Sequence, residues 1–425
     1  MIKLKFVHTA DLHLDTPFKG LSEWNPLLAG KLKDATYKSF SNIIDLCIAE
    51  EVDFLIVAGD IFDSESSSLA AQIRFIDELK RLSGMGIQTY FLCGNHDYLG
   101  SWVKNFSLPE GVFRFGSESV ERFTFSRNGS KIADIYGISY ETSHISENLV
   151  PQYLKGENPA PFSIAVLHGM ADIVGRDENC APFRVKDILS RPFDYWALGH
   201  VHAARVLSRD PLVVYPGNPQ GRDFGEKGPK GCTLVEMTSG MKPEVKFVPV
   251  QQVRFEDLEI DLTGHNDITI LKEVIEEGKS QLAATGRGSG LILRISLVGR
   301  TELHKFLNKP GESVQFTHML NEGQLERDSF SWVDSITVKT SPPADIDRLR
   351  NGTDFTAEMI RNIERYETDK PILDDIINKL QEELPLARIF KEMEGFTENE
   401  KKDILEHAKW LLIDNLPGDT SGGNE

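Results

Sequence analysis

Five short segments of the chain place histidine, aspartate or asparagine directly after a short apolar run. In order, they are His8-Thr-Ala-Asp11-Leu-His13, Gly59-Asp60-Ile-Phe-Asp63, Gly94-Asn95-His96-Asp97, His168-Gly169 and Gly199-His200-Val-His202. Apolar runs of this length are typical of buried strands, and the loops that follow such strands can meet at one place. The pattern therefore favours a fold in which several strand ends converge on a single polar site.

The spacing inside the segments supports this interpretation. Two residues separated by one position point to the same side of an extended segment. Asp11 with His13, and His200 with His202, are therefore natural ligand pairs at strand ends. Glycines at positions 59, 94, 169 and 199 permit sharp turns and close backbone approach. Each segment alone is an ordinary polar turn or helix cap, but the whole set in this order is difficult to explain by chance.

Between these segments the chain alternates strand and helix patterns. Helices are predicted at about 30–50 and 68–82, and strands at 54–58 and 88–92. The second helix is expected to bury Leu69, Ile73, Ile76 and Leu79. Further strands follow up to about residue 250, some of them without a helix between them. This mixture predicts an α/β fold in which sheets pack together with helices outside.

A domain boundary is predicted near Val250. Beyond it, the order strand, helix, strand, helix, strand indicates a small independent α/β unit, which ends at Ser341-Pro342-Pro343. The remainder is helical and acidic. We therefore predict domains at 1–250, 251–343 and 344–416, followed by a disordered tail at 417–425.

Composition limits the function classes. The 425 residues carry a formal net charge of −18, which is unfavourable for a protein that holds DNA tightly by itself. A partner subunit or a homodimer is therefore expected to strengthen DNA binding. The N-terminus shows no secretory signal, and no apolar run approaches the ~18 residues of a membrane span, so we expect no membrane association and a cytoplasmic location. The cysteines lack paired spacing, and buried free thiols are predicted for the three in apolar runs.

The five segments resemble the signature of the calcineurin-like metallophosphoesterases, which is D-x-H, G-D, G-N-H-D, H and G-H-x-H. They resemble especially the SbcD family of bacterial repair nucleases and its YhaO-type members, through residues 8–15, 199–202 and Tyr215-Pro-Gly-Asn-Pro219. This resemblance covers residues 1 to about 235. It implies a metallophosphoesterase β-sandwich flanked by helices, followed by a small βαβαβ capping domain and a helical C-terminal tail. Some archaeal and eukaryotic relatives carry a second active-site histidine where this chain has Asp63, so that role is not transferred.

The resemblance also implies a dinuclear metal site. One metal ion would be bound by Asp11, His13, Asp60 and His202, and the other by Asp60, Asn95, His168 and His200, with Asp60 bridging. Imidazole, carboxylate and amide ligands without thiolate suit manganese, iron or zinc, and we expect Mn²⁺.

His96 directly follows a predicted ligand and is the candidate catalytic residue, because its ring can reach the scissile phosphate and protonate the leaving oxygen. Asp97 is expected to orient His96 or a neighbouring loop, and Asp63 is a second candidate for a supporting role. Basic residues after or near the last ligand pair are candidates for phosphate contacts, with a solvated loop as the alternative: Arg222 and Lys227 first, then Lys230, Arg176 and Arg205.

These expectations predict a two-metal phosphodiesterase that hydrolyses DNA as an exonuclease or endonuclease in repair, together with an SMC-like coiled-coil ATPase subunit. The alternatives are a small-molecule phosphodiesterase or phosphatase with the same site, and a non-catalytic scaffold. An amphipathic helix near the C-terminus either packs on its own domain or docks the coiled coil; it contains Ile404, Leu405, Ala408, Trp410, Leu411 and Leu412.

Overall fold

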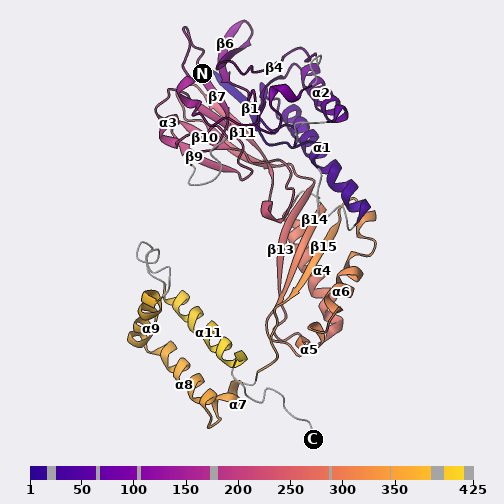
Figure 1. The fold of residues 1–425 in the computed structure, drawn as a ribbon, viewed down its shortest axis with the longest axis vertical. Coiled ribbons are helices and arrows are strands. Elements are labelled where there is room, and N and C mark those ends of the chain that lie inside the picture. The colour runs from indigo at the N-terminus through magenta and orange to yellow at the C-terminus, as the bar shows by residue number, and fades with distance from the viewer. Residues whose placement is uncertain are drawn as a thin grey trace. The chain divides into compact units, whose positions relative to one another are not determined.

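The computed structural model describes residues 1–16, 25–63, 68–102, 107–172, 180–286, 290–344, 346–383 and 397–415 (Figure 1). Contacts divide the chain into two compact units. The first comprises Met1–Leu258, Glu276–Arg294 and Thr317–Ser335, and the second comprises the remaining segments. The domain boundaries that we predict from the sequence stay a prediction, and the predicted tail at 417–425 lies outside the described residues.

The first sheet of the first unit has six strands in the order β12-β11-β1-β2-β3-β4. Strands β1, β2 and β3 are parallel neighbours, and β11 runs antiparallel to β1. Because the three central strands are parallel, their carboxyl ends lie at the same edge. The strands are β1 (Lys3–Thr9), β2 (Phe54–Ala58), β3 (Gln88–Leu92), β4 (Val112–Arg114), β11 (Gly231–Thr238) and β12 (Glu244–Pro249).

The second sheet has the order β5-β6-β7-β8-β10-β9, with β6, β7, β8 and β10 parallel. A core of buried side chains joins it to the first sheet, with Phe6 and Ile56 from one sheet and Ile164 and Ala197 from the other. The prediction of an α/β fold with a β-sandwich is confirmed. The strands are β5 (Glu121–Arg127), β6 (Ser130–Gly137), β7 (Phe162–His168), β8 (Tyr195–Gly199), β9 (Arg205–Arg209) and β10 (Leu212–Tyr215), and a short helix α3 (Val185–Leu189) precedes β8.

Helices α1 (Pro26–Ala49) and α2 (Leu69–Gly84) lie together on the outer face of the first sheet (Figure 1). The predicted buried face of α2 is half wrong: Ile76 and Leu79 are buried, but Leu69 and Ile73 are 58% and 45% exposed. The buried stripe also includes Ala71, Phe75 and Leu82. At about 100° per residue, this stripe faces away from Leu69 and Ile73.

The predicted strand–helix order after residue 250 is present. Strands β13 (Val253–Asp261), β14 (Gly290–Val298) and β15 (Ser331–Val338) form a three-stranded sheet. Helix α4 (Ile268–Ala284) connects the first two strands, and α5 (His304–Leu307) and α6 (Glu312–Asn321) connect the last two. The small α/β unit predicted from the sequence therefore has the expected element order.

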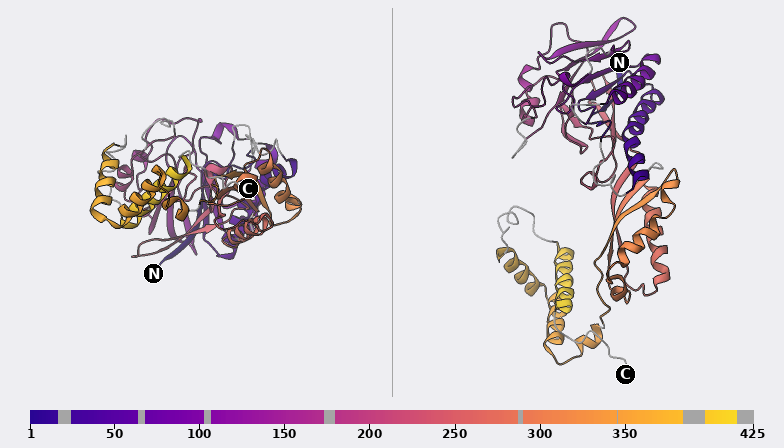
Figure 2. Two further views of the ribbon diagram at one scale, coloured as in Figure 1. Left: turned by 90° about the horizontal axis from the view of Figure 1, so that it is seen from below. Right: turned by 45° about the vertical axis from the view of Figure 1, so that its right-hand side comes forward.

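The C-terminal region is helical, as predicted. It contains α7 (Ile346–Arg350), α8 (Phe355–Thr368), α9 (Lys370–Glu383) and α11 (Glu398–Asn415), and α8 contacts the other three (Figure 2). Leu405 of α11 is buried in an apolar cluster with residues of α8 and α9, whereas Leu411 is 64% exposed. The helix therefore packs on its own region through part of its apolar surface.

Two further expectations concern the cysteines and the membrane. The four cysteines, all of them within the described ranges, form no disulfide, and Cys47, Cys93 and Cys232 are buried thiols, as predicted. Within the described ranges, no helix has the length and apolar character that crossing a membrane requires.

Candidate metal centre

The carboxyl ends of five strands meet at one edge of the two sheets, and each brings a predicted ligand. Asp11 and His13 follow β1, Asp60 follows β2, Asn95 follows β3, His168 ends β7, and His200 and His202 follow β8. Backbone hydrogen bonds tie the first two loops together, because the amide of Asp11 donates to the carbonyl of Gly59 (3.0 Å). The two sheets are joined here too, since His168 Nδ1 lies 2.9 Å from the carbonyl oxygen of Ala58.

One cluster of metal-ligating atoms consists of Asp11, His13 and His202, whose ligand atoms lie within 4.8 Å of one another. Nε2 of His13 and Nε2 of His202 are 3.0 Å apart and point at the same place. Asp11 accepts hydrogen bonds from the amide of His200 at 2.9 and 3.1 Å, which fixes its carboxylate beside the second cluster.

The second cluster consists of Asp60, His168 and His200. Asn95 completes it, with Oδ1 at 3.0 Å from His168 Nε2 and 3.2 Å from His200 Nδ1. Asp60 Oδ2 lies 3.4 Å from His168 Nε2 and 3.9 Å from Nε2 of His13 in the first cluster. One carboxylate oxygen therefore faces both clusters, which is the arrangement expected of a bridging ligand.

The backbone at these positions is strained. Asp11 (φ 54°), His13 (φ 43°), Asp60 (φ 51°) and His200 (φ 97°) all have the left-handed conformation that residues other than glycine rarely adopt. Such strain persists where the surrounding structure over-determines it, and it concentrates at functional sites. The converging imidazole, carboxylate and amide groups are of the kinds that bind divalent metal ions, so these residues fit such ions.

The glycines of the motifs allow the close approach that we predict for them. A Cβ on Gly199 would lie 1.9 Å from the carbonyl oxygen of Ala58, and one on Gly94 would lie 2.2 Å from Asp60 Oδ1. Gly59 has φ +89°, and a Cβ there would lie 2.5 Å from His168 Nδ1. These positions therefore exclude any side chain, because ligand side chains or the backbone of Ala58 occupy the space.

In the second cluster, the charge of each ligand shifts the pKa of its neighbours. Burial would lower the pKa of His168, but the neighbouring Asp60 carboxylate raises it to about 9. Burial and the adjacent His168 lower the pKa of His200 to about 3. Because a ligating imidazole must be deprotonated, a cation bound here would compete with a proton for His168.

The remaining predicted residues around His96 have distinct contacts. His96 Nδ1 lies 3.0 Å from the carbonyl oxygen of Asp63. Asp97 accepts hydrogen bonds from the amides of Gly94 (2.8 Å) and Ile61 (3.1 Å), so it holds two ligand-bearing loops together. Of the two expectations for Asp97, its hydrogen bonds favour a role in orienting the neighbouring loops.

The predicted phosphate-binding residues are mostly engaged elsewhere. Arg222 donates to Asp63 Oδ1 (3.0 Å) and to Glu226 Oε1 (3.1 Å). Lys230 donates to the carbonyl of His202 (2.9 Å), and Lys227 pairs with Asp257 at 2.5 Å on the surface. Arg205 is exposed, and Arg176 lies outside the described residues. A phosphate contact stays a prediction for each of them.

Glu226 is a site residue that the sequence reasoning missed. Its Oε1 lies 2.7 Å from His202 Nδ1, and its Oε2 accepts from Asn218 Nδ2 at 2.7 Å. In the segment from Gly217 to Gly231, the sequence predicts site contacts only for basic residues, Arg222, Lys227 and Lys230. An acidic residue 24 positions after a predicted ligand carries no motif spacing, so only the three-dimensional structure reveals the contact.

Comparisons with known proteins agree with this geometry. The calcineurin-like phosphoesterase family profile matches residues 4–204, and the profile of the middle domain of metallophosphoesterase YhaO matches residues 255–341. The uncharacterized metallophosphoesterase YhaO of Bacillus subtilis is 35% identical over 96% of this chain and 97% of its own length.

Nuclease relatives are more distant. The DNA double-strand break repair protein Mre11 of Sulfurisphaera tokodaii is 27% identical over 95% of this chain and 100% of its own length. A subunit of the nuclease SbcCD of Escherichia coli K12 is 24% identical over 59% of this chain and 69% of its own length. The resemblance stated from the motifs is confirmed: the chain belongs to the YhaO family of calcineurin-like metallophosphoesterases, and it is a hydrolase.

Proposed function

We propose that this protein hydrolyses phosphodiester bonds of DNA with two divalent metal ions, Mn²⁺ being the expected one. The observation that carries the proposal is Asp60 Oδ2, which faces ring nitrogens of both ligand clusters at 3.4 and 3.9 Å. Two ions bound there would supply an activated water and would polarise the phosphoryl oxygens. Relatives named as a nuclease and as a DNA break repair protein direct the proposal to DNA and to repair.

A hydrogen bond orients the Asp60 carboxylate so that it can bridge the two ligand clusters. Its Oδ1 accepts a hydrogen bond from the amide of His96 at 3.0 Å. This contact leaves Oδ2 directed at His13 and His168. The same hydrogen bond fixes the backbone of His96 beside the cluster. The position of His96, the candidate acid, is therefore tied to that of Asp60, the proposed bridging ligand.

His96 is suited to protonate the leaving oxygen through Nε2. Its Nδ1 faces the carbonyl oxygen of Asp63, and a carbonyl can only accept, so Nδ1 carries a hydrogen. Nε2 is then the atom that gains and gives a proton. Four of the site residues are half-buried and four are buried. The half-buried ones are Asn95, His96, His200 and His202, and the buried ones are Asp11, His13, Asp60 and His168. The scissile bond would therefore approach from the half-buried side, which includes His96.

DNA binding is expected to depend on a partner. The net charge is −18, and two basic side chains beside the first cluster, Arg222 and Lys230, already donate to groups of the protein. Electrostatic attraction to the DNA backbone by this chain alone is therefore weak. We propose an SMC-like ATPase as the source of the missing positive charge, whereas a second copy of the chain, itself of net charge −18, would add DNA contacts without adding net positive charge. The name of the Escherichia coli relative describes one component of a larger nuclease.

The test is an assay of the purified chain with Mn²⁺ on linear and circular DNA, compared with cyclic nucleotides and phosphomonoesters. Release of nucleotides from DNA is expected. Hydrolysis of the small esters without any cleavage of DNA would favour the small-molecule phosphodiesterase, and a metal-free, inactive protein would favour a scaffold.

His96→Asn tests the catalytic assignment. We expect turnover of DNA to fall by roughly 10²-fold or more, with Mn²⁺ content unchanged, because the substitution removes the proton donor but no ligand. The matched control is His144→Asn, since His144 is exposed and contacts only Ser143 among the described hydrogen bonds of its side chain. Full activity of His96→Asn would remove His96 from the mechanism.

A further inference from the structure

Three charged side chains lie behind the first ligand cluster. They are Asp63, in the loop after β2, and Arg222 and Glu226, in the segment after β10. We propose that these three residues form a clamp that positions His13 and His202 as ligands of one metal ion. The clamp rests on the proposed metal site, and it assigns to Arg222 a positioning role in place of a phosphate contact.

The orientation of His202 is set by Glu226. Nδ1 of His202 lies 2.7 Å from Glu226 Oε1, and Nε2 points into the cluster, 3.0 Å from His13 Nε2. An ionised carboxylate only accepts hydrogen bonds, so the proton of the neutral ring is held on Nδ1. The lone pair is then on Nε2, the nitrogen that faces the metal position. A carboxylate behind a ligating histidine fixes the tautomer and increases the basicity of the ring.

His13 has a carboxylate behind its ring as well. Its Nδ1 lies 3.1 Å from Asp63 Oδ1, a close polar contact without the alignment of a hydrogen bond, while its Nε2 points toward His202 and Asp60. The His13 side chain is 1% exposed and cannot turn freely. Two ligands of one cluster therefore each have a carboxylate behind the ring.

Arg222 joins the two carboxylates. Nη1 donates to Asp63 Oδ1 at 3.0 Å, and Nη2 and Nε lie 3.1 and 3.3 Å from Glu226 Oε1. The backbone amide of Arg222 donates to Glu226 Oε2 at 2.9 Å. Nη2 also lies 3.0 Å from His202 Nδ1, but both nitrogens are donors, and Glu226 Oε1 accepts from both. The Arg222 guanidinium thus fixes the distance between Asp63 and Glu226, the carboxylates behind His13 and His202.

The charges make the three residues interdependent. The side chains of Asp63, Arg222 and Glu226 are 19%, 23% and 13% exposed, so removing the cation would leave two poorly solvated carboxylates close together. Binding a phosphate would require Arg222 to leave both of them.

The segment that carries Glu226 has its own anchor. It includes the short helix η3 (Phe224–Glu226), and the Phe224 ring packs edge-on against Phe255 of β13, with 5.2 Å between ring centroids. The guanidinium of Arg294 in β14 lies 3.9 Å from the centroid of the Phe224 ring. The packing of Phe224 therefore fixes the backbone of the segment that carries Glu226, and Arg222 fixes its side chain. Both contacts keep Glu226 in place behind His202.

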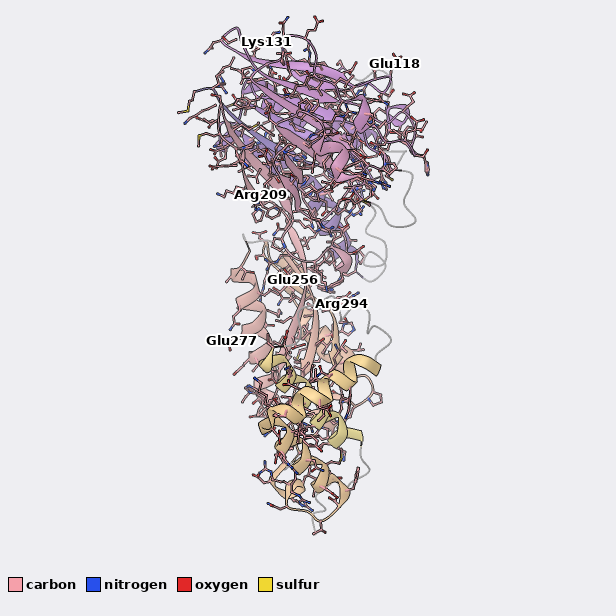
Figure 3. The ribbon with its side chains drawn as sticks, turned by 90° about the vertical axis from the view of Figure 1, so that its left-hand side faces the viewer. Glu118, Lys131, Arg209, Glu256, Glu277 and Arg294 are labelled. Atoms are coloured by element: carbon pink, nitrogen blue, oxygen red, sulfur yellow. The ribbon has the colours of Figure 1, made fainter. Side chains whose placement is uncertain are left out.

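The test is titration of the EDTA-treated full-length protein with Mn²⁺ alone, by calorimetry, with Mn²⁺ electron paramagnetic resonance to count isolated and coupled ions. In Glu226→Gln and Arg222→Met we expect one of two Mn²⁺ ions to bind roughly 10- to 100-fold more weakly, as is typical when a supporting contact of a ligand is lost. The second ion, at Asp60, His168 and His200, should keep its affinity, which also shows that the variants are folded. The matched control is Arg209→Met, because Arg209 is exposed on the first unit (Figure 3).

The outcomes separate the clamp from the site on which it rests. Wild-type protein that binds no Mn²⁺ overturns the proposed metal site and the clamp with it. Two ions with wild-type affinity in both variants overturn the clamp alone. Unchanged Mn²⁺ binding in Arg222→Met with a raised KM for DNA also overturns it, and assigns Arg222 to the phosphate. Equal weakening of both ions shows general damage and contradicts a clamp specific to His13 and His202.

Discussion

Replacing Gly94 by alanine tests whether the bridging position of Asp60 is built into the backbone. A Cβ at Gly94 would lie 2.2 Å from Asp60 Oδ1, 2.8 Å from the Asp60 amide nitrogen and 2.9 Å from His168 Cε1. All three distances are shorter than carbon can tolerate. The φ of Gly94 lies outside the left-handed region, so the substitution probes this contact and not backbone strain.

The magnitude follows from these contacts. A side chain can rotate away, but a backbone nitrogen and a buried histidine ring cannot, so overpacking should cost about 1–3 kcal/mol. Alanine also restricts the unfolded chain, which offsets about 0.4–1 kcal/mol. We expect a net loss of about 1–2 kcal/mol in the metal-free protein. Because Asp60 must move, Mn²⁺ should bind at least about tenfold more weakly, which corresponds to about 1.4 kcal/mol.

Urea unfolding of the EDTA-treated protein and calorimetric titration with Mn²⁺ measure the two effects. The matched control is Gly30→Ala in α1, where a Cβ would meet no atom within 4 Å. That variant should be more stable than the wild type by about 0.5–1 kcal/mol and should bind Mn²⁺ normally. A Gly94→Ala protein with the stability and Mn²⁺ affinity of the wild type would refute the tight placement of Asp60 against Gly94.

Two further outcomes are expected. Burial lowers the pKa of His8 from 6.5 to about 3, so below pH 6.5 the unfolded chain binds a proton that the folded chain does not, and stability falls with falling pH. Between pH 7.0 and 5.5 the wild type should lose about 1 kcal/mol more than His8→Gln in urea unfolding with EDTA, and parallel losses would contradict the burial argument. Mn²⁺ at about a hundred times its Kd should stabilise the wild type by about 2.7 kcal/mol per site. Thermal unfolding of Asp60→Ala should show a much smaller shift, and an equal shift would place the ions elsewhere.

The fold was largely predictable because its signals are local. Strand patterns followed by glycine and a polar residue identify the strand ends where Asp60 and Asn95 lie, and the parallel pairing of β1, β2 and β3 then brings the ends together. The buried face of α2 was harder to assign. Leu69 and Ile73 continue an apolar helical pattern, yet Phe75 and Ala71 face the sheet instead. Which of two apolar stripes on a helix is buried depends on the surface against which the helix packs. The sequence of the helix alone does not identify that surface.

Contacts behind the ligands could not be predicted for a related reason. The D-x-H and G-H-x-H patterns place their ligands by spacing alone. Arg222 instead meets Asp63 across 159 positions of the chain, and Glu226 meets His202 from a loop without periodicity. A basic residue in a glycine-rich stretch after a metal motif favours a phosphate contact on chemical grounds. Its actual partners are carboxylates, and only the folded chain shows them.

Asp63 and Arg222 are best understood as one feature. By the resemblance, Asp63 stands where some relatives have a second active-site histidine, so this chain has a carboxylate beside its first ligand cluster. The charge of that carboxylate is matched by the Arg222 guanidinium 3.0 Å away. The consequence for function is electrostatic: Arg222 donates to two carboxylates, which in the proposed clamp support metal ligands, and Lys230 donates to the backbone of His202. Under the proposed function, binding of the scissile phosphate therefore depends on the metal ions and His96, and binding of the rest of the DNA depends on positive charge that a protein of net charge −18 must obtain from a partner.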